Sequence, residues 1–337
     1  MTDKRPTITT VAKLANVSVA SASRALNGIR TTPEVYERVV EVAERLGYVP
    51  NAAASSLRSR RTGQIAFAMP DVANPVYTAM VASIQEVVRV GGRRLVLHST
   101  GGDVTEELTI VRDLQRQFAD GLILVSLRMT EMLAAEVNRA PVPVVVIGRA
   151  SQGARVDTVQ TDSRVGAAEA VRHLYSAGRR RIAFVNGPSE TLPGKMRLDG
   201  YADALRACKA AFDERLVEIA EGFTVEPGRA ATVRLLERER PDAIFCANDL
   251  IATGALTALH DTGLDVPGDV AVIGMDNTYL CDVVYPRLTS VDIGASRRGH
   301  AAAELLMKRI ELPSRRARII DVPPTLVVRE TCGAGAS

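Results

Sequence analysis

The sequence predicts a small all-α domain at the N-terminus, followed by a larger α/β body of two lobes. Three short helical patterns occupy the first 48 residues, and a basic linker follows at residues 58–63. From Gln64 onward, short apolar runs alternate with amphipathic segments, which is typical of parallel α/β units. A chain of 337 residues is long enough for a small module and a bilobal body.

The first pattern predicts a helix with Thr9 as its N-cap and with Val11, Leu14 and Ala15 on one face. Asn16 then interrupts the pattern, because asparagine tolerates the left-handed backbone conformation that a tight turn requires. We therefore expect a short turn at this point, before a second helix.

Ser18 is the predicted N-cap of the second helix, which turns Ala22, Ala25 and Leu26 toward the core. The opposite face is short, polar and basic, as contacts with DNA bases and phosphates require. Its members are Val19, Ala20, Ser23, Arg24 and Asn27.

The third helix is expected to begin with Thr32 as cap and Pro33 at its first position, and to end at Gly47. Between them, apolar residues recur at helical spacing: Val35, Val39, Val42 and Leu46. Two short helices packed on a third predict a helix-turn-helix, whose second helix enters the major groove. An ordinary three-helix scaffold is the alternative, and the basic outward face of the second helix favours DNA binding.

Charge is unevenly distributed along the chain. Residues 1–62 contain ten Lys and Arg against five Asp and Glu, a formal charge of +5, and the remaining 32 basic and 34 acidic residues leave the body at −2. A basic module suits a polyanion, because neutralised phosphates release condensed counterions. Charge alone leaves DNA, RNA and anionic lipid open.

The segment after the third helix predicts a short hinge helix. Asn51 is a good N-cap, three alanines favour helix, and Leu57 projects from an otherwise small surface without an obvious apolar partner. The basic linker at residues 58–63 suits either contact with phosphates or simple solvation between domains, and in isolation solvation is the better interpretation.

In the body, polar side chains at strand ends are the place to look for chemistry, because ligands of open α/β sheets bind at the carboxyl ends of strands. The first lobe is expected to contain strands at Ile65–Met69, Arg94–Leu97, Gly121–Leu124 and Val144–Ile147. The second is expected to contain strands at Ile182–Asn186, Ala243–Cys246 and Val270–Gly274, with helices near residues 163–177, 196–208, 228–238 and 249–262.

Asp71, Asn74 and Tyr77 follow the first strand and supply a carboxylate, an amide and an aromatic ring, a mixture that suits a sugar. Each alone is more readily a cap, a surface charge or a core aromatic. Repetition of such residues at successive strand ends supports a ligand cleft. The further candidates are Arg149, Arg197, Phe223, Asn248 and Asp276.

Other classes of function find little support. Gly187 to Lys195 resembles a phosphate-binding loop, but its glycines are too far apart and Met196 replaces the Ser or Thr that would bind magnesium. There is no dinucleotide fingerprint and no nucleophile elbow. We therefore expect no enzyme, no metal and no cofactor. The histidines, His98, His173, His260 and His300, have no metal-ligand spacing.

The four cysteines lie far apart, so free packing thiols are expected rather than disulfides or zinc ligands. Residues 1–6 are polar and no apolar stretch follows them, which predicts neither a signal peptide nor a transit sequence. No apolar run approaches the roughly 20 residues of a spanning helix, so a cytoplasmic protein without membrane contact is expected.

The sequence resembles the LacI/GalR family of bacterial transcription regulators from Ile8 to about Glu330. The pattern from Thr10 to Asn27 is similar to that family's helix-turn-helix, and Leu46-Gly47-Tyr48 with Pro50, Asn51, Ala54 and Leu57 is similar to its hinge. Further matching motifs are Asn74-Pro75-x-Tyr77, Gly178 to Phe184, Arg197-x-x-Gly200-Tyr201, Ala247 to Ala255 and Val272 to Asn277.

The resemblance implies a helix-turn-helix domain at residues 1–50, a hinge helix and linker at 51–63, and a two-lobed periplasmic-binding-protein-like domain at 64–330, with a tail at 331–337. The first lobe would span about 64–161 and 293–325, and the second about 162–292. A homodimer would bind a palindromic operator, with Leu57 as a wedge in the minor groove. An effector between the lobes would control operator affinity.

By position, the resemblance assigns two sets of residues. The DNA-binding set is Thr7, Thr9, Ser18, Val19, Ala20, Ser21, Ser23, Arg24, Asn27, Asn51, Ala54 and Leu57. The effector-binding set is Asp71, Asn74, Tyr77, Arg149, Arg197, Phe223, Asn248 and Asp276. Departures from the family pattern include Asn16 for glycine, Ser55 for arginine, Val35-Tyr36 for Thr-Arg, Gly148 for an acidic residue, and Pro193 near the ligand contacts.

The function expected is a repressor of carbohydrate-utilisation genes whose effector is a small sugar or sugar-like molecule. A purine-responsive regulator that uses a corepressor is the alternative. A sugar-binding transport component is a weaker one, because an operator-reading head stands where an export signal would be. The tail has no heptad pattern, so a dimer is expected rather than a coiled-coil tetramer.

Overall fold

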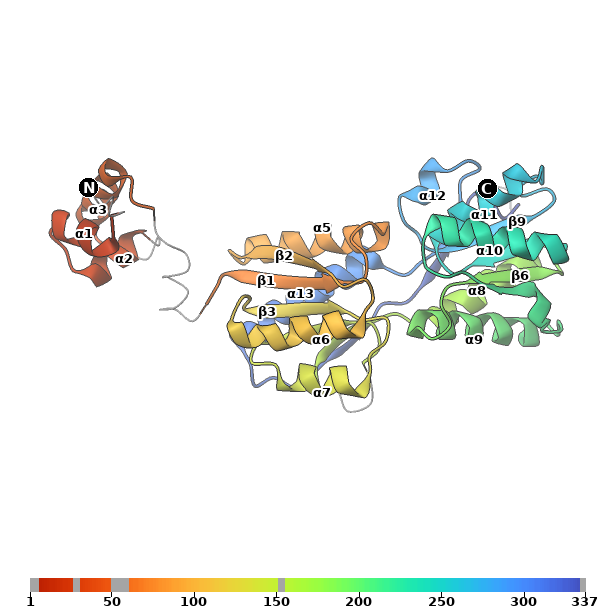
Figure 1. Cartoon of the computed structure of the whole chain (residues 1–337), viewed down its shortest axis with the longest axis horizontal. Helices are drawn as coiled ribbons and strands as arrows, with labels where there is room; N and C mark the ends of the chain where they lie inside the picture. The colour runs from red at the N-terminus through yellow and green to blue at the C-terminus, as the bar shows by residue number, and fades with distance from the viewer. Residues whose placement is uncertain (1–5, 27–30, 50–60, 151–154, 334–337) are drawn as a thin grey trace. The chain divides into compact units, whose positions relative to one another are not determined.

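The computed structural model describes residues 6–26, 31–49, 61–150 and 155–333. It forms two compact units, residues 1–62 and residues 63–337, and each is described by itself (Figure 1). Within the described residues, no helix is long and apolar enough to span a bilayer, and no group of three or more metal-binding side chains occurs.

Within its described residues, the first unit contains three helices, α1 (Ile8–Leu14), α2 (Val19–Leu26) and α3 (Pro33–Leu46). Asn16 adopts a φ of 52°, the left-handed conformation predicted for the turn between α1 and α2. Gly47 ends α3 with a φ of 61°. The small core consists of Val11, Ala12, Ala15, Ala22, Ala25, Val39, Val42 and Ala43.

Two details of α1 were predicted wrongly. Thr7, not Thr9, is the N-cap, and its side chain accepts a hydrogen bond from the Thr10 amide at 3.3 Å. Leu14 is 53% exposed and does not share the buried face of Val11 and Ala15. The helix therefore begins earlier than its first apolar residues indicate, because threonine at either position could cap it.

The first lobe is a six-stranded parallel sheet in the order β11-β5-β4-β3-β1-β2. Its strands are β1 (Gln64–Met69), β2 (Arg94–Ser99), β3 (Gly121–Val125), β4 (Val144–Ile147), β5 (Asp157–Gln160) and β11 (Ile319–Asp321). Its helices are α5 (Pro75–Val90), α6 (Val104–Asp113), α7 (Glu131–Arg139) and α13 (Ala295–Glu311), with a 3-10 turn, η1 (Leu114–Arg116).

Alternate residues of β1 serve opposite faces of this sheet. Ile65, Phe67 and Met69 belong to the core that includes α5 and α13, whereas Ala66 and Ala68 pack with α6 and α7 (Figure 1). All five side chains are fully buried, which explains why the strand reads as a continuous apolar run.

The second lobe is another six-stranded sheet, in the order β12-β10-β9-β8-β6-β7, parallel except for β12. Its strands are β6 (Ile182–Asn186), β7 (Val217–Ile219), β8 (Ala243–Cys246), β9 (Ala271–Asp276), β10 (Thr289–Asp292) and β12 (Thr325–Val327). Its helices are α8 (Ser163–Ser176), α9 (Leu192–Ala207), α10 (Val225–Arg238), α11 (Asp249–Asp261) and α12 (Leu280–Val283), with a 3-10 turn, η2 (Glu214–Leu216).

The predicted strands and helices of the body are present, with shifted ends. β9 continues to Asp276, and α9 begins at Leu192 because Thr191 caps it through a 3.1 Å hydrogen bond from the Gly194 amide. The strands that the sequence did not predict, β5, β7, β10, β11 and β12, have three or four residues each. Strands this short contain too few alternating apolar and polar residues to be recognised from the sequence.

The chain passes between the two sheets three times, after β5, after β10 and between β11 and β12. The cysteines are free thiols, and Cys246, Cys281 and Cys332 are buried, as expected for packing residues.

Candidate functional site

One pocket of about 540 Å³ is lined by residues from both lobes at the carboxyl ends of their strands. This volume lies within the usual range for small-molecule sites, roughly 300–1,000 Å³. All eight residues of the predicted effector-binding set line it: Asp71, Asn74, Tyr77, Arg149, Arg197, Phe223, Asn248 and Asp276. The structure therefore brings together side chains from six separate segments of the sequence.

On the side of the first lobe, the turn after β1 and the start of α5 present three of these residues. Asn74 caps α5, and its Oδ1 accepts a 3.1 Å hydrogen bond from the Val76 amide. Asp71 Oδ1 accepts a 2.8 Å bond from the Ala73 amide. Tyr77 lies in the first turn of α5, so the cap that begins the helix also sets the ring at the pocket.

On the side of the second lobe, Arg197 projects from α9. Its Nη1 donates a 2.6 Å hydrogen bond to the carbonyl of Ala247, and its Nη2 lies 3.5 Å from Asp276 Oδ1. The Phe223 ring lies beside it, with the guanidinium carbon 5.9 Å from the ring centroid. Two contacts and a ring thus hold a planar hydrogen-bond donor in place, while Arg197 Nε is buried without a partner.

Asn248 connects the segment after β7 to the start of α11. Its Oδ1 caps α11 by accepting a 2.9 Å hydrogen bond from the Ile251 amide, and its Nδ2 donates a 3.0 Å bond to the Phe223 carbonyl. The cap interpretation that the sequence offered for this residue is therefore correct, and the residue also lines the pocket. Its amide fixes the chain that carries the Phe223 ring.

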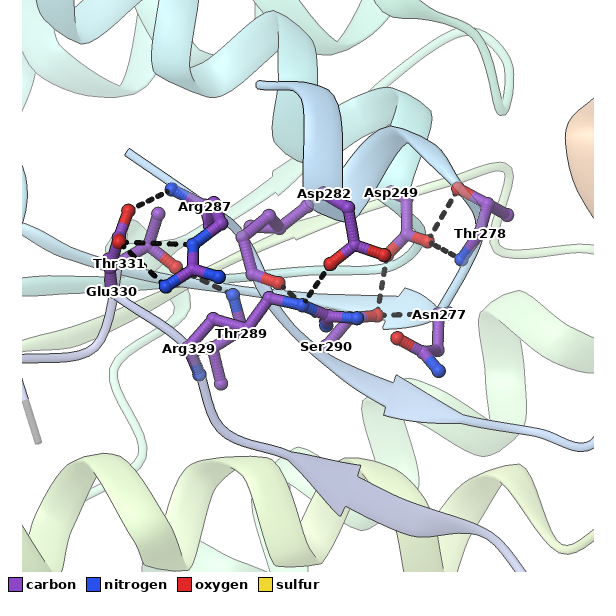
Figure 2. Close-up of polar contacts among 11 residues, drawn as sticks. Asp249, Asn277, Thr278, Asp282, Arg287, Thr289, Ser290, Arg329, Glu330 and Thr331 are labelled. Atoms are coloured by element: carbon purple, nitrogen blue, oxygen red, sulfur yellow. Dashed lines mark hydrogen bonds and ion pairs between the residues drawn. The ribbon is translucent and has the colours of Figure 1, made fainter. Parts of the chain in front are cut away.

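Asp276 ends β9 in an unusual backbone conformation, with a φ of 115°, and Asn277 follows at 52°. Asparagine tolerates the left-handed region, but a φ of 115° is rare for a residue with a side chain and persists only where its surroundings hold it. Asp249 supplies this support: its Oδ2 accepts hydrogen bonds from the amide and the hydroxyl of Thr278 at 2.7 and 2.9 Å, and its Oδ1 accepts one from Ser290 at 2.5 Å (Figure 2).

The network continues away from the pocket. The Asn277 amide donates to Ser290 Oγ at 3.1 Å, so the turn is tied to β10 (Figure 2). Arg329 Nε pairs with Asp282 at 2.8 Å, and Arg287 Nε pairs with Glu330 at 3.0 Å. These contacts attach the segment after β12 to α12 and to the loop before β10.

Burial changes the acidity of the groups in the pocket. It raises the pKa of Asp276 to about 7, with Asp249 acting in the same direction and Arg197 and Arg298 acting against it. Burial also raises the pKa of the Tyr77 hydroxyl, and the nearby Asp276 adds to this effect. Tyr77 is therefore a neutral hydroxyl that can donate a hydrogen bond.

Several lining residues were not in the predicted set. Arg298 on α13 is buried, and Ser126, Arg128 and Glu190 line the pocket from the ends of β3 and β6. Arg128 Nη2 donates to Glu190 at 2.6 Å and so joins the two lobes. Arg298 had a usable signal: it shares the helical spacing of the buried Ala302 and Leu305, which places a cation on an apolar face.

In the first unit, α2 presents the residues of the predicted DNA-binding set. Val19, Ala20 and Arg24 are exposed, whereas Ser21 and Ser23 are half-buried. Ser18 caps α2, because its Oγ accepts a 3.0 Å hydrogen bond from the Ser21 amide. Thr7 and Thr9 are exposed on α1 and its cap. Asn27, Asn51, Ala54 and Leu57 lie outside the described residues.

Both units are similar to parts of bacterial regulatory proteins or of binding proteins. The profile of bacterial regulatory proteins of the lacI family matches residues 7–51, and that of the periplasmic binding protein-like domain matches residues 171–332. The chain is 35% identical over 337 aligned positions to the HTH-type transcriptional regulator CelR of Thermobifida fusca, covering 97% of this chain and 98% of that protein.

Solved structures agree with the sequence relatives. A complex of the transcriptional regulator CelR with cellobiose is 33% identical and superposes with a TM-score of 0.74, covering 97% of this chain and all of that one (100%). The lac repressor dimer bound to operator and the anti-inducer ONPF is 25% identical, with a TM-score of 0.85 over 98% of this chain and 99% of that one.

Proposed function

The chain belongs to the LacI family of bacterial regulatory proteins, and we propose that it represses carbohydrate-utilisation genes under the control of a small sugar or sugar-like effector. Proteins of this family are DNA-binding transcriptional regulators and not enzymes. The observation that carries the proposal is that one chain combines an exposed helix-turn-helix face with a pocket lined by all eight candidate effector residues.

For the DNA-binding part, the proposal assigns base and phosphate contacts to α2 and its cap. Arg24 is exposed in the last turn of α2, and its Nη2 lies 3.5 Å from Ser21 Oγ, which leaves the rest of the guanidinium free for DNA. Val19 and Ala20 are small, apolar and exposed, so they suit contact with a thymine methyl group. Thr7 and Thr9 suit the phosphates, and Leu57 remains the proposed minor-groove wedge.

The effector part rests on the chemistry of the pocket. A ring (Phe223), a guanidinium (Arg197), an amide (Asn248) and a carboxylate (Asp276) converge there, and these groups suit the apolar face and the hydroxyls of a sugar. The relative solved with cellobiose supports a carbohydrate as the class of effector. Occupancy of the pocket would change operator affinity through residues 51–63.

The assembly proposed is a homodimer on a palindromic operator. A two-fold DNA site matches a two-fold protein, and the solved lac repressor is a dimer on its operator. The proposed boundaries are 1–50 for the DNA-binding domain, 51–63 for the hinge and 64–330 for the effector-binding and dimerisation domain.

Binding of purified protein to genomic fragments tests the proposal. The wild type should bind selected fragments with an affinity that falls steeply with salt. Arg24→Ala should weaken this binding by about 1–3 kcal/mol, or roughly 5- to 150-fold. Arg45→Ala, which removes an exposed cation from the last turn of α3, is the matched control and should have a smaller effect.

Ligand binding should be unaffected by Arg24→Ala, because the substitution lies in the other compact unit. A thermal-shift screen of monosaccharides, disaccharides, polyols and purines on both proteins identifies the effector class. If no fragment is bound in a sequence-selective and salt-sensitive way, the proposal that the protein represses genes from an operator is wrong. If only purines stabilise the protein, the proposal that its effector is a sugar is wrong.

A further inference from the structure

We infer that the effector carries an anionic group, a carboxylate or a phosphate, and that Arg298 binds it together with Arg197. The inference rests on the proposed function, because it concerns the chemistry of the same pocket. It begins from a residue that the sequence did not single out. Arg298 lies in the first turn of α13, on the first-lobe side of the pocket, and is only 7% exposed.

The Arg298 side chain has no protein partner within the described parts of the chain. Its buried Nε makes no hydrogen bond, and none of its nitrogens forms an ion pair within 4.0 Å. The other arginines of α13 differ: Arg297 is exposed and lies 3.3 Å from Asp292, and Arg309 Nε lies 2.9 Å from Asp157. A buried guanidinium without a partner is costly, so its retention in a ligand pocket points to a ligand group that pairs with it.

The buried charges of the pocket do not balance without such a group. Arg197, Arg298 and Asp276 are each less than a tenth exposed and line the same space. Asp276 is the carboxylate of this buried set, but burial raises its pKa and so disfavours its charged form. Arg298, whose pKa burial lowers to about 10, stays protonated at neutral pH, so the buried set carries an excess of positive charge.

The remaining charged groups at the pocket do not supply the missing anion. Glu190 is already paired with Arg128 at 2.6 Å, and Glu221 is exposed. Asp71 is partly exposed and is engaged by the Ala73 amide. Asp292 is nearer in sequence, but it is taken up by Arg297 and by the Gly294 amide at 2.6 Å.

The geometry also gives the anion a role in control. Arg298 comes from the first lobe and Arg197 from the second, and the charge of Arg197 disfavours protonation of Arg298. Two facing cations repel, whereas an oxyanion between them attracts both, so the ligand would favour the arrangement that brings the lobes together. A neutral sugar leaves the repulsion in place. The Tyr77 hydroxyl, on the same side as Arg298, can add a hydrogen bond to the anion.

The expected ligand is therefore a polyhydroxylated molecule with one acidic group, such as a sugar acid or a sugar phosphate. The full-length protein is to be tested near neutral pH and at constant ionic strength by thermal shift and titration calorimetry. The probes are D-glucose, D-gluconate, D-glucuronate, D-glucose 6-phosphate and inorganic phosphate. Stabilisation by D-gluconate and D-glucuronate identifies a sugar acid, and stabilisation by D-glucose 6-phosphate and inorganic phosphate identifies a sugar phosphate. Either result supports the inference if the rise in melting temperature exceeds that caused by D-glucose.

Variants then connect the effect to the residue. Arg298→Met removes the charge with little loss of volume and should weaken binding of the stabilising anion by about tenfold or more. Arg298→Lys should retain part of the affinity, which loss of packing alone would not explain. Arg297→Met, beside it on the exposed face, is the control and should bind like the wild type.

Three outcomes overturn the inference: no stabilisation by any of the four anions, equal stabilisation of wild type and Arg298→Met by the anions, or a neutral sugar that stabilises the wild type at least as much as the anions do. The last result discards the anion and keeps the proposed sugar effector. If the wild type shows no selective operator binding, the proposed function is contradicted. The inference about the anion is then still decided by comparing anion binding of the wild type and of Arg298→Met.

Discussion

Arg197 Nη2 lies 3.5 Å from Asp276 Oδ1, and this pair joins α9 to the end of β9 in the floor of the pocket on the side of the second lobe. A buried ion pair adds to stability only when its other hydrogen-bonding atoms are satisfied. Here they are not, because Arg197 Nε is buried and has no hydrogen-bond partner among the residues that the structure describes. Under the proposed function, the effector would supply hydrogen bonds that this pair lacks.

Replacing Arg197 with methionine should abolish control by the effector. The expected loss of effector affinity is at least about 30-fold, or roughly 2 kcal/mol for a charge-assisted hydrogen bond. Calorimetric titration of the effector found in the screen measures it. Arg206→Met, which removes an exposed cation paired with Asp203 on the same helix, should leave the affinity unchanged. Equal losses in the two variants would show that general positive charge, not this site, matters.

Glu107 should make stability depend on pH. It is fully buried in α6, and burial raises its pKa from 4.5 to about 7. The folded state therefore holds the proton more tightly than the unfolded state, so the stability that this group contributes is present below about pH 4.5 and is lost as the pH rises through 7. Glu107→Gln should raise the free energy of unfolding at about pH 8 by roughly 2 kcal/mol and much less at about pH 5.

Urea denaturation at the two pH values measures this difference. Glu106→Gln, an exposed neighbour on the same helix, is the control and should show no such pH-dependent gain. A Glu107→Gln variant with the same pH profile as the wild type would contradict the assignment. Burial also raises the pKa of Asp276, but this group is present in the wild type and in Glu107→Gln, so it does not contribute to the difference between them.

Gly254 should tolerate no side chain. A Cβ at this position in α11 would lie 2.2 Å from the Val225 carbonyl oxygen and 2.5 Å from the Arg229 amide nitrogen of α10. Because backbone atoms cannot move aside as a flexible side chain can, Gly254→Ala should lower the free energy of unfolding by about 1–3 kcal/mol. Gly222→Ala is the control, since its Cβ would meet Pro227 at 3.9 Å. Similar destabilisation by both would argue against the close approach of α10 and α11.

Exposed apolar side chains on α12 and on either side of it are expected to contribute to the dimer. Tyr279, Val283 and Tyr285 are 65%, 68% and 92% exposed, an unusual concentration of apolar surface for a free face. Replacing Val283 and Tyr285 together by serine should weaken dimerisation by about tenfold or more, as measured by analytical ultracentrifugation. Met132→Ser, which replaces an exposed apolar residue of α7, should leave dimerisation unchanged. A dimer that persists unchanged would place the interface elsewhere.

Particular residues show how far the sequence could be read. Asn16 and Ser18 defined the turn and the start of α2 correctly, because the left-handed conformation and the hydroxyl cap are local preferences of those residue types. Thr9 and Leu14 were misplaced, because a second threonine was available as cap and a short helix has few apolar residues to fix its face. Arg298 was missed because its signal, the helical spacing that it shares with Ala302 and Leu305, was not used.

The sequence by itself determined the succession of helices and strands and the polar residues that follow the strands, because caps, turns and apolar runs depend on neighbouring residues. Only the tertiary structure decided which of those residues meet. The two sheets bring Asp71 and Asp276 to one pocket, and packing of α13 on α5 adds the buried Arg298. Burial and the pKa of a side chain depend on elements distant in the chain, and it is these that set the chemistry of the pocket.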